Sequence, residues 1–401
     1  MPKTLYAGGQ VFNPVSMSVS AADVVVEDGK IAAVGSGLDG DEQVDVSGRT
    51  LLPGLFDCHT HVMITHIDMW KVLQRPFSYM FYEAEQNLAA TLRIGITTVR
   101  DAGGADLGVK TAVEDGLIEG PRMQISIRML SQTGGHGDDW MASGATVPLF
   151  MDYPGSPSSI VDGPEQMRVK VRELIRNGAD VIKVATTGGV LSARDDPRHA
   201  HFSEEELEML VTEASKAGRW VMAHAQGTEG IKRAIRVGIR SIDHGIFLDD
   251  EAIQMMIDHG TWLVPTLVAP TGVITAAEAG AQIPEASIIK AKETIDIHRD
   301  SIKRAYEAGV KIAMGTDSGV TPHGENLKEL DLMTGLGMKP GEVLRATTLT
   351  AAELMGLEKE LGSIEEGKRA DLVVVEGDPY DFKTLPERIE TVVKDGRRVV
   401  G

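Results

Sequence analysis

Between residues 51 and 356, short apolar runs alternate with amphipathic stretches of helical length. Six of the apolar runs begin one to three residues after a glycine; these glycines are Gly95, Gly178, Gly218, Gly238, Gly260 and Gly309. A glycine just past the last turn of a helix supplies the left-handed residue that ends it, and here a strand-like run follows each time. The pattern therefore predicts repeated βα units.

The amphipathic stretches also carry helix signals of their own. Ser203 and Glu206 have the spacing of a capping box, and the apolar residues that follow it on one helix face are Leu207, Leu210, Val211 and Ala214. Two more apolar segments, residues 51–62 and 122–130, raise the number of expected strands to eight. Eight strands alternating with helices favour a (β/α)8 TIM barrel over an open doubly wound sheet.

Both ends of the chain read differently, as short strands joined by tight turns. Asp28-Gly29 separates two β-branched runs near the N-terminus, and Asp395-Gly396 does the same near the C-terminus. Strands from the two ends are expected to pair in one small domain. We predict a β-sandwich domain from residues 1–52 and 357–401, and a (β/α)8 barrel from residues 53–356.

Composition and charge narrow the possible partners. The 401 residues include 40 Lys and Arg against 59 Asp and Glu, a net charge of −19, which disfavours nucleic acid and anionic membranes. No window approaches the run of about 20 apolar residues that a spanning helix needs, and the N-terminus lacks the pattern of a secretory signal. A single cysteine, Cys58, cannot form an internal disulfide, so we expect a cytoplasmic protein.

Polar residues stand at the ends of several predicted strands, where the active site of a barrel forms. His59 and His61 are two residues apart and therefore face the same side of their strand, while His224, His244 and Asp317 end three others. A single histidine is more often a hydrogen-bonded core residue, but burying five such groups unpaired would cost several kcal/mol each. This set predicts a metal site, with Zn²⁺ as the expected ion and Mn²⁺, Co²⁺ or Fe²⁺ as alternatives.

Lys183 lies between Ile182 and Val184, where a charged amine beside a metal would suffer desolvation and repulsion. One solution is a carbamate formed with CO₂, whose oxygens can bridge two metal ions about 3.5–4 Å apart. The other is a neutral lysine that forms a Schiff base. The histidines favour the carbamate, because a Schiff-base site needs no cluster of five ligands.

In this order on these strands, His59-x-His61, Lys183, His224, His244 and Asp317 resemble the binuclear, carboxylated-lysine branch of the metal-dependent amidohydrolase superfamily. The segments 51–61 and 362–373 resemble it as well, so the similarity covers nearly the whole chain. Further motifs are similar to its Xaa-Pro and Xaa-Arg dipeptidase group, which also resembles imidazolonepropionase; they are residues 100–104, 134–138, 184–190, 315–319 and 322–324.

The resemblance implies a role for each ligand. His59, His61 and Asp317 would bind the more buried metal, His224 and His244 the more exposed one, and carbamylated Lys183 would bridge the two. It also implies that a hydroxide shared by the metals attacks the substrate carbonyl. Asp317 would then accept the proton and deliver it to the leaving amine.

His136, within Gly134-Gly-His-Gly137, is expected to reach the site and donate to the oxyanion, although a histidine in a plain glycine turn is the alternative. Dipeptidases of this type often carry a tyrosine for the substrate carboxylate where this chain has Gln226, which weakens the case for carboxylate-terminated dipeptides. His201, His323 and Arg198 are further candidates for substrate contact, with solvated loop residues as the alternative.

For three further residues the sequence predicts a structural role. His298 is expected to be exposed on a helix, and Cys58 to be a small core residue rather than a nucleophile. Asp101 would orient a ligand or form an internal ion pair with the neighbouring Arg100.

Together these features predict a metal-dependent amidohydrolase with two divalent ions, cleaving C–N bonds of small molecules such as Xaa-Pro or Xaa-Arg/Lys dipeptides or N-acyl amino acids. Hydrolysis of cyclic amides, lactones or carbamates, or deamination, at the same site is the alternative. A non-catalytic scaffold is disfavoured, because all six ligand candidates are present. A homo-oligomer is also expected.

Overall fold

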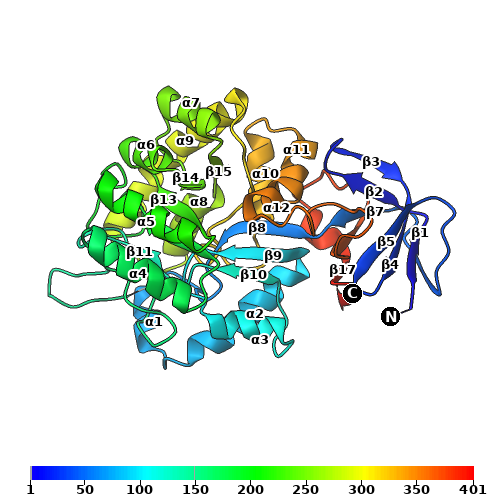
Figure 1. Ribbon diagram of the computed structural model, residues 1–401, viewed down its shortest axis with the longest axis horizontal. Helices are drawn as coiled ribbons and strands as arrows, with labels where there is room; N and C mark the ends of the chain where they lie inside the picture. The colour runs from blue at the N-terminus through cyan, green and yellow to red at the C-terminus, as the bar shows by residue number, and fades with distance from the viewer. Residues whose placement is uncertain (1, 149) are drawn as a thin grey trace.

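The computed structural model describes residues 2–148 and 150–401. At its centre lie parallel strands with helices packed around them (Figure 1). One three-stranded sheet contains β8 (Leu55–Thr60), β9 (Ile96–Asp101) and β10 (Arg122–Ile125). A five-stranded sheet contains β11 (Met129–Leu130), β12 (Val181–Ala185), β13 (Trp220–Ala225), β14 (Ser241–His244) and β15 (Trp262–Val264).

The strand pattern differs from the predicted closed barrel at two places. The predicted strand 122–130 is divided into β10 and β11, because Ile127 between them adopts a left-handed backbone with φ of 66°. The predicted eighth strand near residues 311–314 makes a single bridge, from Ile312 to Leu263, instead of a regular ladder. The segment 311–314 also contacts β8 on its other side, since the N–H of Cys58 donates to the carbonyl of Met314 at 2.9 Å. The structure therefore shows a mixed α/β fold whose parallel ladder is not continuous.

The helices follow the sequence signals closely. In chain order they are α1 (Met69–Gln74), α2 (Tyr79–Arg93), α3 (Leu107–Glu114), α4 (Pro164–Arg176), α5 (Glu204–Lys216), α6 (Thr228–Arg236), α7 (Asp250–His259), α8 (Val268–Glu278), α9 (Glu285–Ala308), α10 (Lys328–Gly335), α11 (Pro340–Ala346), α12 (Leu349–Met355) and the 3₁₀ helix η1 (Leu385–Arg388). Ser203 and Glu206 form the predicted capping box before α5. Gly260 and Gly309 end α7 and α9 in the left-handed conformation, as predicted.

None of these helices is long and apolar enough to cross a membrane, within the residues that the structure describes. Their buried faces instead cover the parallel strands. Leu207 and Leu210 of α5 join the same core cluster as Ile182 and Val184 of β12. Burial of such side chains contributes about 1.5–3 kcal/mol each, which fixes the strand ends that carry the polar residues.

Strands from both chain ends form two further sheets, at the right of Figure 1. The six-stranded sheet has the order β18 (Arg397–Val400), β17 (Ile389–Lys394), β16 (Leu372–Glu376), β7 (Arg49–Pro53), β2 (Gln10–Asn13), β3 (Ser18–Ala21). The four-stranded sheet has the order β5 (Lys30–Gly35), β4 (Asp23–Glu27), β1 (Thr4–Ala7), β6 (Glu42–Asp45). Both predicted hairpins, β4–β5 and β17–β18, are present. The domain boundaries at residues 52 and 357 stay a prediction.

Candidate metal centre

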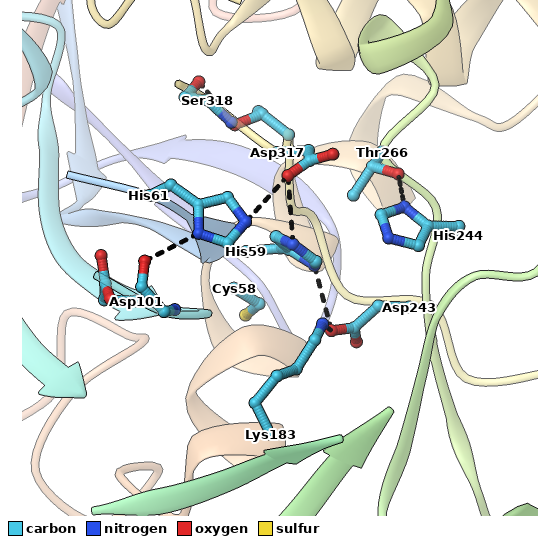
Figure 2. Close-up of polar contacts among 12 residues, drawn as sticks. Cys58, His59, His61, Asp101, Lys183, Asp243, His244, Thr266, Asp317 and Ser318 are labelled. Carbon is cyan, nitrogen blue, oxygen red and sulfur yellow. Dashed lines mark hydrogen bonds and ion pairs between the residues drawn. The ribbon is translucent and has the colours of Figure 1, made fainter. Parts of the chain in front are cut away.

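Two histidines at the end of β8 converge on one carboxylate. Nε2 of His59 lies 3.2 Å and Nε2 of His61 3.1 Å from Oδ1 of Asp317. His244, at the end of β14, completes the group on the other side, and one ligand atom from each of His59, His244 and Asp317 lies within 4.8 Å of the others (Figure 2). Imidazole nitrogens and a carboxylate oxygen are donors that suit Zn²⁺ and related ions. The donor set therefore fits a divalent metal.

The backbone at two of these residues is strained. His244 has φ of 75° and Asp317 has φ of 62°, values that non-glycine residues adopt at a cost of about 1–3 kcal/mol each. Nδ1 of His244 lies 2.7 Å from Oγ1 of Thr266, whose φ is also positive, at 52°. Such strain persists where the surrounding structure fixes the residue, and it concentrates at functional sites.

Asp57 fixes the chain around two of the candidate ligands. Its buried carboxylate accepts hydrogen bonds from the N–H of His59 at 3.0 Å, from Oγ1 of Thr316 at 2.6 Å and from Nδ2 of Asn326 at 2.9 Å. Because Thr316 precedes Asp317, this one side chain ties the end of β8 to the turn that presents Asp317. Burial raises the pKa of Asp57 despite these donors. No sequence motif assigned a role to Asp57.

Asp101 supports the neighbouring turn. It accepts from the N–H groups of Val62 at 2.9 Å and Gly103 at 3.0 Å, and the carbonyl of Gly103 lies 2.8 Å from Nδ1 of His61. Burial raises the pKa of Asp101 to about 6. Two roles were considered for Asp101, and the structure favours orientation of His61. The other role, an ion pair with Arg100, is not formed, because Arg100 pairs with Asp243.

Lys183 rises from β12 beneath this group and contacts Asp243 (Figure 2). Its Nζ lies 2.7 Å from Oδ2 of Asp243, and Nη2 of Arg100 lies 3.2 Å from Oδ1 of the same carboxylate. Burial would raise the pKa of Asp243, but the two cations hold it well below its usual range. Burial also lowers the pKa of Lys183, although Asp243 opposes that effect. The buried pairs between Asp243, Lys183 and Arg100 were not foreseen from the sequence.

The rings of His224 and His136 extend this group. The ring of His224 lies 4.6 Å from that of His244, and His136 stacks on His224 with ring centres 4.2 Å apart. Burial lowers the pKa of both His224 and His244 well below the ordinary value, so their rings are neutral, the form that binds metal. Nδ1 of His136 lies 2.7 Å from Oγ of Ser192, which leaves its Nε2 for a substrate.

A family model described as the amidohydrolase family matches residues 50–399. This chain belongs to the amidohydrolase family. An ochratoxinase of Aspergillus niger is 34% identical over 402 residues, which cover 95% of this chain and 83% of the relative. An imidazolonepropionase of Geobacillus sp. (strain WCH70) is 27% identical over 431 residues, covering 95% and 91%.

Solved structures are similar over the full length of the amidohydrolase. A crystal structure of a Xaa-Pro dipeptidase with methionine bound in the active site matches with a TM-score of 0.91 and 34% identity, covering 100% of both chains. The resemblance found from the sequence motifs is confirmed, and the chain is a hydrolase that acts on C–N bonds. Family membership and the His59, His244 and Asp317 group together support metal dependence.

The candidate ligands of the amidohydrolase line one cavity of about 590 Å³. All six predicted ligands are on its wall, together with the predicted catalytic His136 and the predicted substrate contact Gln226. Gln226 is buried, and its Oε1 has no hydrogen-bond partner among the residues that the structure describes. An acceptor of this kind is available to a substrate donor inside the cavity.

Three predicted substrate contacts lie elsewhere, since the cavity lining does not include them. His201 is buried, and burial lowers its pKa to about 4. Nε2 of His323 lies 3.2 Å from the carbonyl of His61 and 3.1 Å from that of Ile64, so this ring contacts the turn after β8. Arg198 is exposed, pairs with Asp196 and covers the ring of Phe247.

The expectation for His298 is wrong, whereas that for Cys58 is confirmed. His298 lies on the buried face of α9, and its Nε2 is 2.9 Å from the carbonyl of His244. The helix packs this face against the strand ends, so the ring supports the strained backbone of His244 instead of facing solvent. Cys58 is buried among apolar side chains, and burial raises the pKa of its thiol to about 12, which excludes a thiolate nucleophile.

Proposed function

We propose that this amidohydrolase cleaves the amide bond of small substrates, namely Xaa-Pro or Xaa-Arg/Lys dipeptides or N-acyl amino acids. The observation that carries the proposal is the convergence of His59, His61 and Asp317 on one point of the cavity wall. The dipeptidase and ochratoxinase among its relatives support this substrate class. The cavity of about 590 Å³ suits a small molecule.

The proposal includes two divalent metal ions, expected to be Zn²⁺. His59, His61 and Asp317 would hold one, and His224 and His244 the other. Lys183 is buried beside this group, and burial lowers its pKa against the opposing effect of Asp243. A lower pKa raises the fraction of neutral amine, the form that would react with CO₂ to give a carbamate able to hold both ions. When bound, such ions supply a water of lowered pKa and polarise the substrate carbonyl.

Asp317 and His136 would carry the proton and charge movements. The Asp317 carboxylate accepts a proton from the attacking water and returns it to the leaving nitrogen, a role suited to an acceptor held between two imidazoles. Nε2 of His136 donates to the oxyanion that forms from the carbonyl, because Ser192 already engages Nδ1. Gly189 permits this position, since a Cβ there would lie 2.1 Å from the His136 ring.

The proposed fold is a (β/α)8 barrel with an attached β-sandwich. The two parallel sheets and the segment 311–314, which bonds to neighbours on both sides, support the barrel. Side chains of both terminal sheets share one core cluster, among them Val24 of β4 and Leu372 of β16, which supports the sandwich. The homo-oligomer and the cytoplasmic location stay predictions.

The decisive experiment combines metal analysis with a substrate panel. Protein produced with zinc and bicarbonate is assayed for two metals per chain and for hydrolysis of Xaa-Pro, Xaa-Arg and N-acyl amino acid libraries, with an ochratoxin added because of the ochratoxinase relative. Imidazolones, lactones, carbamates and nucleobases form the second arm. If the protein hydrolysed or deaminated only compounds of the second arm, the proposal of linear amide hydrolysis would be wrong and the alternative would hold. Protein without bound metal would refute the proposed metal centre.

A further inference from the structure

The wall of the cavity carries a buried arginine whose hydrogen-bonding capacity is mostly unused. Arg128 follows β10, lines the cavity, and exposes only 5% of its side chain. Its Nη2 pairs with the Asp152 carboxylate. Nε and Nη1, in contrast, are buried without a hydrogen-bond partner among the residues that the structure describes. Buried donors of a charged group are nearly always satisfied in folded proteins, so these two nitrogens are open to a partner that the described residues do not supply.

Asp152 does not account for the burial of Arg128. The Asp152 side chain is 59% exposed, so water solvates its carboxylate without help from the arginine. Asp139 and Tyr153 are the other titratable groups whose charge acts on Arg128. An arginine that served only a surface ion pair would keep its remaining nitrogens in water, as long cationic side chains ordinarily do.

The guanidinium lies one aromatic ring away from the proposed metal centre. Its central carbon is 5.7 Å from the centre of the Phe150 ring, and that ring is 5.6 Å from the ring of His61. The exposed wall of this cavity is largely apolar and includes Ile64, Met129, Val190, Leu191 and Ile246. A substrate whose amide bond lies at His59 and His61 therefore meets apolar side chains and the buried guanidinium of Arg128, while Lys183 and Arg194 are the other cations on this wall.

We propose that Arg128 binds the free carboxylate of the substrate, so that the preferred substrates are N-acyl amino acids or dipeptides with an apolar C-terminal residue. The inference rests on the proposed amide hydrolysis and specifies its substrate class. It also supplies the cation that the uncharged Gln226 does not. Arginine matches a carboxylate because its planar donors form charge-assisted hydrogen bonds.

Kinetics on a matched substrate pair test the carboxylate preference. N-acetyl-L-methionine is compared with N-acetyl-3-(methylthio)propylamine, which has hydrogen in place of the carboxylate. We expect kcat/KM of the wild type to be at least about 100-fold higher for the substrate with the carboxylate. In Arg128→Gln, kcat/KM should fall for that substrate and stay unchanged for the substrate without it. Arg194→Gln is the control, because Arg194 also lines the cavity but is exposed and stacks on Trp140. Equal loss on both substrates, or loss in Arg194→Gln as well, would overturn the inference.

A second pair of variants separates recognition from a structural role. If Arg128 served only to pair with Asp152, then Asp152→Asn and Arg128→Gln would have the same effect. Under the proposal, Asp152→Asn keeps or increases the carboxylate preference, because it removes a competing anion. Arg128→Lys, which keeps the charge, should retain part of the preference. Thermal melting of each variant checks that it folds.

Binding measured without turnover keeps the inference separate from the proposed function. Calorimetry of L-methionine and of 3-(methylthio)propylamine with the metal-loaded full chain compares wild type with Arg128→Gln. We expect L-methionine to lose at least about tenfold in affinity in the variant and the amine to be unchanged. Unchanged binding of L-methionine would refute the role of Arg128 even if the enzyme hydrolyses amides. Absence of all hydrolysis with the expected binding difference would instead refute only the proposed reaction.

Discussion

Glu329 offers a quantitative test of how burial acts on a charged group in this fold. The residue lies on α10 and is fully buried. Its two carboxylate oxygens accept from the N–H of Leu267 at 2.8 Å and of Val268 at 2.9 Å, where α8 begins. Burial raises the pKa of Glu329 to about 8, although these two donors oppose the shift. Replacement by glutamine removes the titration and keeps the size of the side chain.

The sign of the effect follows from proton linkage. Between the ordinary pKa of 4.5 and about 8, the folded chain holds a proton on Glu329 that the unfolded chain has released, so stability falls as pH rises. At about 1.4 kcal/mol for each pH unit, the full difference is about 5 kcal/mol. Glu329→Gln loses at most one backbone hydrogen bond, a cost of about 1–3 kcal/mol that does not depend on pH. The free energy of unfolding of the variant should therefore rise relative to wild type by about 5 kcal/mol from pH 4.5 to pH 9.

Urea unfolding of both proteins at half-unit steps across this range measures that difference. Groups other than Glu329 titrate alike in the two proteins, so their contributions cancel. Glu325→Gln is the matched control, since the Glu325 side chain is 44% exposed and pairs with Lys328 near the start of the same helix. Parallel curves for Glu329→Gln and wild type would refute the reasoning. They would mean that the two N–H donors and the helix N-terminus hold Glu329 ionised with an ordinary pKa.

Three further predictions concern the metal centre. Asp57→Asn should lower the free energy of unfolding by about 2–4 kcal/mol and reduce bound metal, because Thr316 and Asn326 lose a charged acceptor; denaturation and metal analysis check this. Lys183→Ala should bind fewer than two metals, measured by elemental analysis, and a variant with two metals and full activity would disprove the bridge. His136→Asn should lower kcat by about 100-fold or more with metal content unchanged, and unchanged turnover would exclude the oxyanion role.

Local sequence patterns predicted most of the elements correctly. The hairpin turns at Asp28-Gly29 and Asp395-Gly396 and the capping box at Ser203 are where the sequence puts them, because turn and cap geometry depend on a few adjacent residues. The continuous barrel ladder was not found. Ile127 has no local signal for its left-handed backbone, which separates β10 from β11.

Helix exposure was harder to predict. His298 lies in a helix rich in charged residues, so its neighbours suggest a solvent-facing position. The buried face of that helix is decided by how it packs over the strand ends, where His298 reaches the carbonyl of His244. Successive side chains on a helix point about 100° apart. An error of one residue in placing the buried face therefore turns a predicted exposed residue into a buried one.

The sequence by itself determined the six candidate ligands, His136 and the family, because residue type and spacing at strand ends are local properties of the chain. Only the tertiary structure decided what surrounds them. Asp57 accepts a hydrogen bond from Asn326, which is 269 positions away in the sequence. Arg128 pairs with Asp152, more than 20 residues away. Which polar group finds a partner and which is buried without one depends on packing between distant segments, and no local pattern records that.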